Sequence, residues 1–499
     1  MLKNLLAVKS VQDLATESDK GELRRSLGPV ALTAIGIGGI IGTGIFVLTG
    51  LAAAQHAGPA IVLSFIIAGI GCIFAGLCYA EFASMIPVSG SAYAYSYATL
   101  GEGVAWFIGW NLVLEYLFAA STVSVGWSRY LVKLLEEFDI NFIPAALTSA
   151  PVDYTVEKGF FATGAMFNLS AVLIVAIVTV ILVLGIRQSS VTNAIVVAIK
   201  VTIVVAVIGF GAFYITADHW HPFIPENTGV WGQYGWSGII RASGIIFFAY
   251  IGFDAVSTAA QEAKNPQRDV PFGILASLII CTVLYVLMSG VLTGMLEYPK
   301  LNDAAPVATA LQAHAELRWL TIPVVFGALA GLTSVILVMM LAQSRIFYSM
   351  SRDGLLPPRF RACHPEWKTP VFSTVLTGVG AGLMGGLLPL NVLGELVSSG
   401  TLLAFVTVCI GIMVLRVTKP ELPRPFRVKG VWFVGIGGTL FCGLMLASLF
   451  MTGGTWYRIV GWTIVGFIVY FGYGYKHSAL RNGGSSRAAK PGPASPATK

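Results

Sequence analysis

The stretch Ile35-Gly36-Ile37-Gly38-Gly39-Ile40-Ile41-Gly42-Thr43-Gly44-Ile45-Phe46 places five glycines in an apolar segment that is long enough to cross a bilayer. Each interior glycine costs a helix roughly 1 kcal/mol, so we expect this helix to unwind near its middle. Backbone groups freed inside a membrane are tolerated only where they line a cavity or find other partners. Unwound backbone at mid-membrane therefore predicts a binding site for a small solute.

The composition around this stretch is typical of a polytopic membrane protein. The chain is 56% hydrophobic and 11% charged, and its mean hydropathy is +0.78. A membrane-spanning helix needs about 20 apolar residues. Runs of this length predict twelve spans, near residues 30–54, 60–85, 103–127, 167–186, 191–216, 238–260, 271–296, 320–350, 372–389, 392–415, 431–451 and 456–475.

The basic residues predict how these spans are oriented. Most of the 31 Lys and Arg residues fall in segments on the same side as the N-terminus. The positive-inside rule then places both termini in the cytoplasm. The net charge of +7 is a topology signal that also suits anionic lipid, and no nucleic acid partner is expected. The six scattered cysteines lack the spacing of disulfides or metal ligands, and no metal site is predicted.

A second interrupted helix is predicted five spans after the first. The segment SGIIFFAYIGFD, residues 243–254, sets Gly252 between bulky residues and just before the carboxylate of Asp254. Broken helices at equivalent places in two five-span halves indicate an inverted repeat. Close helix packing is the other interpretation of such glycines.

Five motifs in one order carry a resemblance to a known family. They are Gly36 to Phe46, Tyr79-Ala80-Glu81-Phe82 running to Pro87-Val88-Ser89-Gly90-Ser91-Ala92-Tyr93, Phe248 to Asp254, Glu262 with Asn265-Pro266-Gln267-Arg268, and Ser344-Arg345 running to Pro357. In these motifs the chain resembles the amino acid-polyamine-organocation (APC) superfamily, and most of all bacterial members of its cationic amino acid transporter branch.

The resemblance implies an all-α polytopic fold of twelve transmembrane helices. It consists of a 5+5 inverted repeat with broken helices 1 and 6, plus two extra helices. The expected divisions are a cytoplasmic tail (1–29), the first repeat (30–216), the second repeat (238–415), helices 11 and 12 (431–475) and a disordered cytoplasmic tail (481–499). By analogy, the protein belongs in the plasma (inner) membrane of a bacterium.

The same resemblance assigns a substrate site. Amides of Gly42, Thr43 and Gly44 would begin the second half of helix 1, where the helix dipole favours a carboxylate. Carbonyls of Phe248, Ala249 and Ile251 would end the first half of helix 6 and accept from an ammonium group. Ile40 could add a carbonyl, and Phe248 could cover the substrate. The full predicted substrate-binding set is Ile40, Ile41, Gly42, Thr43, Gly44, Glu115, Phe248, Ala249, Ile251 and Asp254.

Ionisable residues inside the spans are candidates for ion coupling. Lys200 lies too deep in span five for its stem to reach water easily, and a buried ammonium loses its proton more readily than an exposed one. In proton-coupled relatives a helix-five lysine replaces the bound sodium, so H⁺ is expected in place of Na⁺, without a cofactor. An ion pair of Lys200 with Glu115 or Asp254 is the structural alternative. Glu115 could instead select cationic substrates, and Asp254 could cap the restarting helix or relay protons.

Three further charges are candidates for gates. Arg241 stands near the outer end of span six, where it can snorkel, and Glu81 and Arg345 lie near cytoplasmic ends. The latter two are expected to contribute to an inner gate together with Glu262, Arg352 and neighbouring charges.

The sequence therefore predicts a proton-coupled importer of cationic or small neutral L-amino acids that works by alternating access. An exchanger of amino acids or polyamines, or a membrane amino acid sensor, is the alternative. Enzyme signatures such as H-E-x-x-H and G-x-S-x-G are absent from the sequence. The chain carries no signal for or against a small single-helix subunit.

Overall fold

The computed structural model describes the chain in seven stretches. They are residues 7–9, 27–86, 90–140, 143–155, 159–185, 190–451 and 454–482. Most of the two predicted tails, and Pro87 to Ser89 of the second motif, lie outside these described residues.

The described chain is mainly helical. Its first half contains α3 (Pro29–Ile40), η1 (Gly44–Leu48), α4 (Thr49–Ala52), η2 (Ala53–Ala57), η3 (Gly58–Ala60), α5 (Ile61–Met85), α6 (Ser91–Thr99), α7 (Glu102–Glu137), α8 (Leu169–Val183) and α9 (Ser190–Gly211). Its second half contains α10 (Gly235–Ile246), η7 (Phe247–Tyr250), α11 (Asp254–Thr258), α12 (Pro266–Met295), α13 (Pro306–Gln312), α14 (Arg318–Arg352), α15 (Val371–Leu387), α16 (Leu390–Thr418), α17 (Val431–Phe450), α18 (Thr455–Val469), η12 (Tyr470–Gly474) and α19 (Tyr475–His477).

Two features go beyond the sequence predictions. The long loop after span three contains an antiparallel hairpin, in which β1 (Val152–Thr155) pairs with β2 (Gly159–Ala162). Span three, predicted to end at residue 127, continues as α7 to Glu137. The last turns of α7 carry charged residues, which lower the hydropathy below that of a span. A helix that extends beyond the membrane into water accommodates such residues.

Eight helical runs of the described chain are long and apolar enough to cross a membrane. Three shorter apolar helices, α3, α8 and α15, accompany them. Large exposed hydrophobic side chains, such as Leu173 and Ile177 on α8 or Phe433 and Leu440 on α17, suit a lipid-facing surface. The count of twelve spans and the inverted repeat remain predictions.

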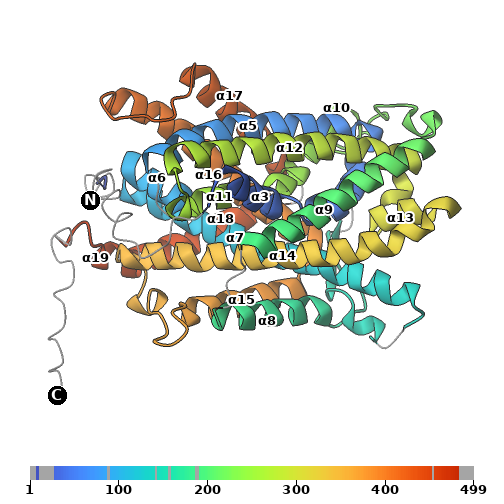
Figure 1. Ribbon diagram of the computed structural model, residues 1–499, viewed down its shortest axis with the longest axis horizontal. Helices are drawn as coiled ribbons and strands as arrows, with labels where there is room; N and C mark the ends of the chain where they lie inside the picture. The colour runs from blue at the N-terminus through green and yellow to red at the C-terminus, as the bar shows by residue number, and fades with distance from the viewer. Residues whose placement is uncertain are drawn as a thin grey trace.

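The short helices lie at the centre of the bundle. In Figure 1, α3 and α11 lie among α5, α12 and α14, which run along the long axis, and α9, which crosses the view obliquely. The last described helix, α19, lies at the left of that view. We call this the terminal end, where Lys9 and Arg481 are found, and we call the opposite end, which carries the β1–β2 hairpin, the loop end.

Candidate substrate site

Both central helices break where the glycine patterns predict. The first helix ends at Ile40, Ile41 is extended (φ −72°, ψ 101°), and helical structure resumes at Gly44. The sixth ends at Tyr250, and α11 begins at Asp254. A helix start leaves N–H groups without intrahelical partners and a helix end leaves carbonyls, so the breaks offer donors on one helix and acceptors on the other.

Glycine allows the two broken helices to touch through their backbones. Gly252 has φ +120°, and a Cβ there would lie 2.6 Å from the carbonyl carbon of Gly39. A Cβ on Gly44 would overlap the backbone of Ala249. Close packing and helix interruption, which the sequence presents as alternatives, therefore occur at the same glycines.

One residue that joins the two breaks was missed by the sequence analysis. The hydroxyl of Tyr285, on α12, lies 2.8 Å from the carbonyl oxygen of Ile40 and 2.9 Å from that of Ala249. Both carbonyls were expected to face the substrate ammonium, and here they accept from the phenol. A tyrosine in an apolar span gives no sequence signal for this role, because the contact is made across three helices.

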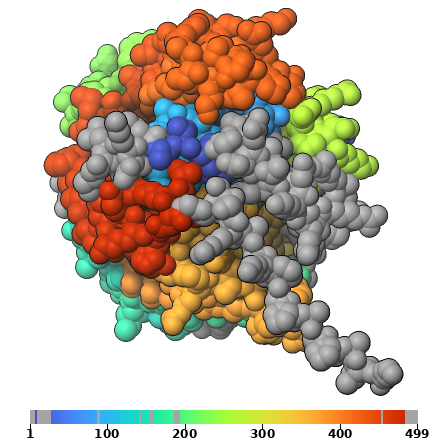
Figure 2. Space-filling model, turned by 90° about the vertical axis from the view of Figure 1, so that its left-hand side faces the viewer, coloured from blue at the N-terminus to red at the C-terminus, as the bar shows by residue number. Residues whose placement is uncertain are grey.

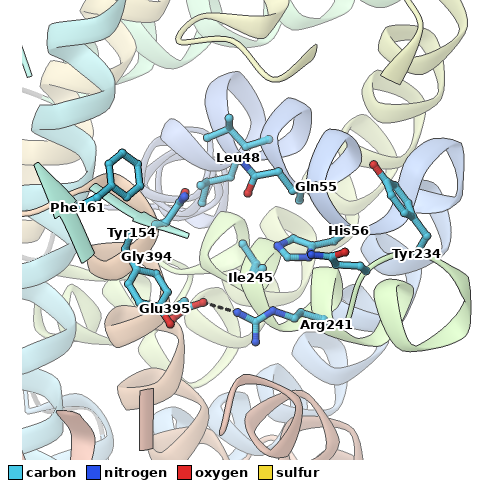
Figure 3. Close-up of a pocket in the computed structure, with 14 residues that line it drawn as sticks. Leu48, Gln55, His56, Tyr154, Phe161, Tyr234, Arg241, Ile245, Gly394 and Glu395 are labelled. Atoms are coloured by element: carbon cyan, nitrogen blue, oxygen red, sulfur yellow. Dashed lines mark hydrogen bonds and ion pairs between the residues drawn. The ribbon is translucent and has the colours of Figure 1, made fainter. Parts of the chain in front are cut away.

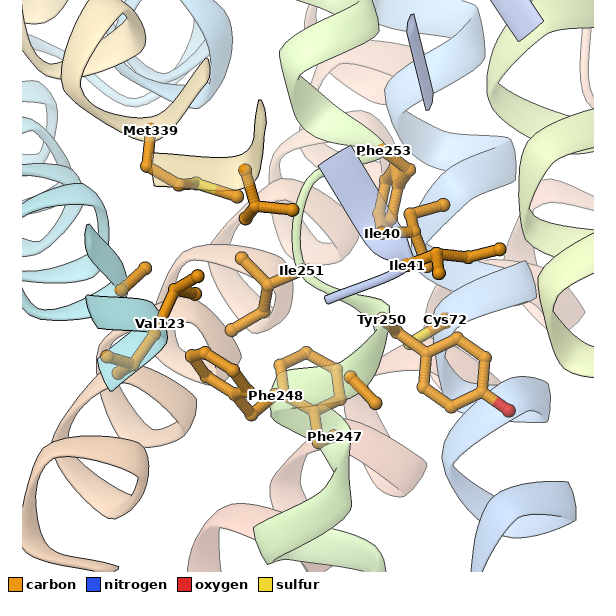
Figure 4. Packing of buried hydrophobic residues seen from close by; sticks show 14 of the residues in the cluster. Ile40, Ile41, Cys72, Val123, Phe247, Phe248, Tyr250, Ile251, Phe253 and Met339 are labelled. Atoms are coloured by element: carbon orange, nitrogen blue, oxygen red, sulfur yellow. The ribbon is translucent and has the colours of Figure 1, made fainter. Parts of the chain in front are cut away.

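A small cavity lies between the breaks. Its volume is about 10 Å³, which is room for a single water molecule. Figure 4 shows Val123, Phe248, Ile251 and Met339 around one space beside the breaks. The lining residues are Gly39, Ile40, Gly42, Thr43, Gly44, Ala119, Val123, Phe248, Ile251, Val335 and Met339.

The lining includes part of the predicted set, and apart from Thr43 its side chains are apolar. Four predicted residues, Ile41, Glu115, Ala249 and Asp254, do not line the cavity. Five lining residues were not predicted: Gly39, Ala119, Val123, Val335 and Met339. Small and apolar side chains on α7 and α14 are frequent throughout these helices, so the sequence could not distinguish those that face the site.

Lys200 is attached to the broken part of helix 1. Its side chain is fully buried, and Nζ donates to the carbonyl oxygens of Gly38 (2.8 Å) and Ile41 (3.0 Å). Its stem passes over Gly331 of α14, where an added Cβ would lie 2.9 Å from Cε. The alternative ion pair with Glu115 or Asp254 is not formed, because Lys200 bonds to backbone carbonyls instead.

The carboxyl groups of Glu115 and Asp254 are buried and form no ion pair with Lys200. Glu115 is 1% exposed, and both of its carboxyl oxygens are buried without a hydrogen-bond partner. Asp254 accepts a short hydrogen bond from the Tyr116 hydroxyl at Oδ2, while Oδ1 has no partner. Asp254 occupies the first position of α11 and does not cap it through its side chain. Holding carboxylate oxygens away from water without a hydrogen-bond partner is costly.

Ion pairs link the helices at the terminal end. Glu81 and Arg345, expected in one gate, belong to separate clusters. Each ion pair joins segments distant in sequence: Arg345 with Glu262 at 3.2 Å, Arg416 with Glu81 at 2.6 Å, Arg424 with Glu81 at 3.3 Å, Lys9 with Asp353 at 2.9 Å and Arg481 with Glu102 at 2.6 Å. Figure 2 shows this face, with the blue N-terminal residues next to the red C-terminal segment.

The loop end contains a larger cavity of about 410 Å³, which we call the vestibule. Arg241 and Glu395 meet on its wall, with Nη2 2.6 Å from Oε1, and His56 lies nearby (Figure 3). The expectation that Arg241 snorkels to water is wrong: the residue is 2% exposed because a carboxylate on α16 holds it inside. Glu395 was missed, since a lone glutamate near a span end resembles a loop anchor.

The fold thus defines a class, a polytopic membrane protein with two broken helices and a small cavity at its centre. The model of the amino acid permease family matches residues 27–471, and the chain belongs to this family, which confirms the resemblance to the APC superfamily. The family and the relatives below are transporters, not enzymes.

Three relatives illustrate the range of the family. The methylthioribose transporter of Bacillus subtilis is 45% identical over 96% of this chain and 100% of its own. The branched-chain amino acid permease BcaP of the same organism is 44% identical over 95% of this chain and 98% of its own. The vacuolar cationic amino acid transporter 4 of Arabidopsis thaliana is 37% identical over 84% of this chain and 68% of its own.

Proposed function

We propose that the protein imports amino acids with apolar side chains together with protons, by alternating access across the plasma (inner) membrane. The carrying observation is the small cavity, which is lined by the ends of both broken helices and, apart from Thr43, by glycines and apolar side chains. An α-amino acid presents a carboxylate and an ammonium on one carbon, which suits the two helix ends. The remaining wall, including Val123, Val335 and Met339, suits an aliphatic side chain.

Cationic substrates are less well supported by this lining. Glu115, the residue that would select arginine or lysine, stands outside it. The 44% identity to a branched-chain amino acid permease adds support for an aliphatic substrate. The 37% identity to a cationic amino acid transporter gives weaker support for a cationic substrate.

Proton coupling rests on Lys200. A charged Nζ donates to the carbonyl of Gly38, in the last turn of α3, and to that of Ile41, in the break. Hydrogen bonds from a charged donor are about twice as strong as neutral ones. Loss of the proton weakens the hold on helix 1 and so changes the substrate site. Glu115 and Asp254 are further proton carriers in this scheme.

The proposed orientation puts the terminal end in the cytoplasm. This follows from the basic residues, and the cavity at the loop end would then receive substrate from outside. The ion pairs of the terminal end would together form the inner gate, which is closed in this conformation.

The test is uptake of labelled leucine, alanine and lysine into proteoliposomes, with and without an inward proton gradient. Leucine uptake should follow the gradient, and Lys200→Met should lose that dependence. Lys300→Met, at an exposed pair with Glu297, is the matched control and should retain it. Uptake that ignores pH but needs internal amino acid would instead identify an exchanger.

A further inference from the structure

The vestibule contains an opposite-charge pair that the central site does not use. Arg241 projects from α10 and Glu395 from α16, and both are almost fully buried. Thr455 of α18 donates to Glu395 Oε2 at 2.6 Å, and the stem of Arg241 packs against Gly232. Contacts from α18 and from the loop before α10 therefore hold both charges in place.

The pair has unused hydrogen-bonding capacity on its positive side. Arg241 Nε is buried without a partner. A second guanidinium, that of Arg458, lies over the ring of Tyr154, and its Nη1 is 3.7 Å from Glu395 Oε2. Arg458 Nη1 and Nη2 also have no hydrogen-bond partner. Two arginines thus share one carboxylate, which leaves an excess positive charge suited to an incoming carboxylate.

The vestibule lies directly along the route to the central cavity. Arg241, Ile245 and Phe248 occupy positions i, i+4 and i+7 of one helical run and hence one face. The first two line the vestibule and the third lines the central cavity. On the other broken helix, Gly44 lines the central cavity, and Leu48, four residues later, lines the vestibule. The two cavities are stacked, with Ile245 and Leu48 between them.

We infer that the vestibule is a second binding site, which receives the zwitterionic head of an α-amino acid before the central site does. The substrate carboxylate binds the guanidinium of Arg241, and the ammonium binds Glu395, both of which line the cavity. Arg458 does not line the cavity and contributes positive charge from beside Glu395. The cavity of about 410 Å³ lies within the usual range for small-molecule sites. The inference rests on the proposed function for its ligand class, but it concerns recognition of the head group and not the side chain.

The test measures how many amino acids one purified chain binds. Labelled alanine and leucine are titrated against the detergent-solubilised native protein and Val123→Phe, which fills the central cavity. We expect two classes of site in the native protein and only the weaker one in Val123→Phe. Adding Glu395→Gln or Arg241→Met to Val123→Phe should weaken that remaining class by about tenfold or more. Glu395→Gln alone should retain the central class.

Ligand analogues and controls separate recognition from simple gating. Leucinol lacks the carboxylate and 4-methylpentanoate lacks the ammonium, so neither should displace alanine from Val123→Phe. Glu297→Gln, at an exposed pair, should change nothing, and thermal unfolding verifies that each variant is folded. One site per native chain, no binding to Val123→Phe, or unchanged binding after both vestibule substitutions would overturn the inference. Absence of proton-driven uptake would overturn the proposed function while leaving these results intact.

Discussion

The two ends of the bundle use charge in opposite ways. At the terminal end, five ion pairs join distant segments, and the chain's own ends take part through Lys9 and Arg481. At the loop end, the Arg241–Glu395 pair lies on the wall of a large cavity. Charges at the first end close a face, whereas those at the second end border an open space. In the proposed alternating-access cycle, this structure would be the conformation closed at the terminal end.

The first test forces apart the two broken helices, which touch midway between the two ends of the bundle. Gly252→Ala would place a Cβ against Gly39 at a backbone angle that alanine rarely adopts. We expect a destabilisation of at least about 3 kcal/mol and no transport. Gly209→Ala, where nothing lies within 4 Å of the added Cβ, should behave as native. Thermal unfolding and uptake measure both, and a folded, active Gly252→Ala protein would contradict the backbone contact.

The second test removes a fully buried charge of the terminal end. Glu81 is fully buried between Arg416 and Arg424 and accepts from the Val428 amide at 2.7 Å. Glu81→Ala leaves arginine charges without a partner, and we expect a loss of roughly 3–5 kcal/mol of stability. Chemical or thermal denaturation measures it. The exposed Glu297→Ala serves as control and should shift stability by less than about 1 kcal/mol.

The third test concerns the link between the breaks. Tyr285→Phe removes the hydroxyl that serves Ile40 and Ala249, and we expect a loss of roughly 1–3 kcal/mol without amino acid present. Tyr348→Phe, at a 39% exposed tyrosine, is the control. Equal unfolding temperatures for the two variants would show that the phenol hydroxyl does not support the breaks.

The smallest effect is expected at the most exposed of these terminal-end pairs. Arg345 and Glu262 are each about 30% exposed, so Arg345→Met should cost only about 0–1 kcal/mol. Its consequence should be more frequent opening of the terminal end. In a Cys363→Ser background, a cysteine at the buried Thr258 should then react faster with a water-soluble thiol reagent. Unchanged labelling would exclude this pair from the gate.

Local signals in the sequence account for the centre of the molecule. Runs of glycine predict the broken helices because the cost of glycine in a helix is intrinsic to the residue. Lys200 stands out because an ammonium deep in an apolar span is rare. These features depend on neighbours in the chain, and the sequence presents them directly.

Partners across helices could not be predicted in the same way. Glu81 meets Arg416, and Arg241 meets Glu395, at sequence separations of 335 and 154 residues. Tyr285 reaches both breaks from a third helix. Such pairings depend on how the bundle assembles, and one sequence gives charges and hydroxyls without their geometry.

The backbone contact between the broken helices also determines which residues of the candidate site can be substituted and which cannot. The polar groups expected to hold the substrate head belong to the peptide chain, and glycines such as Gly39 and Gly252 leave no room for variation there. The facing wall consists of ordinary apolar side chains such as Val123 and Met339, which can be exchanged at modest cost. New selectivity can therefore arise by a few substitutions on that wall, while the frame that captures a solute stays as it is.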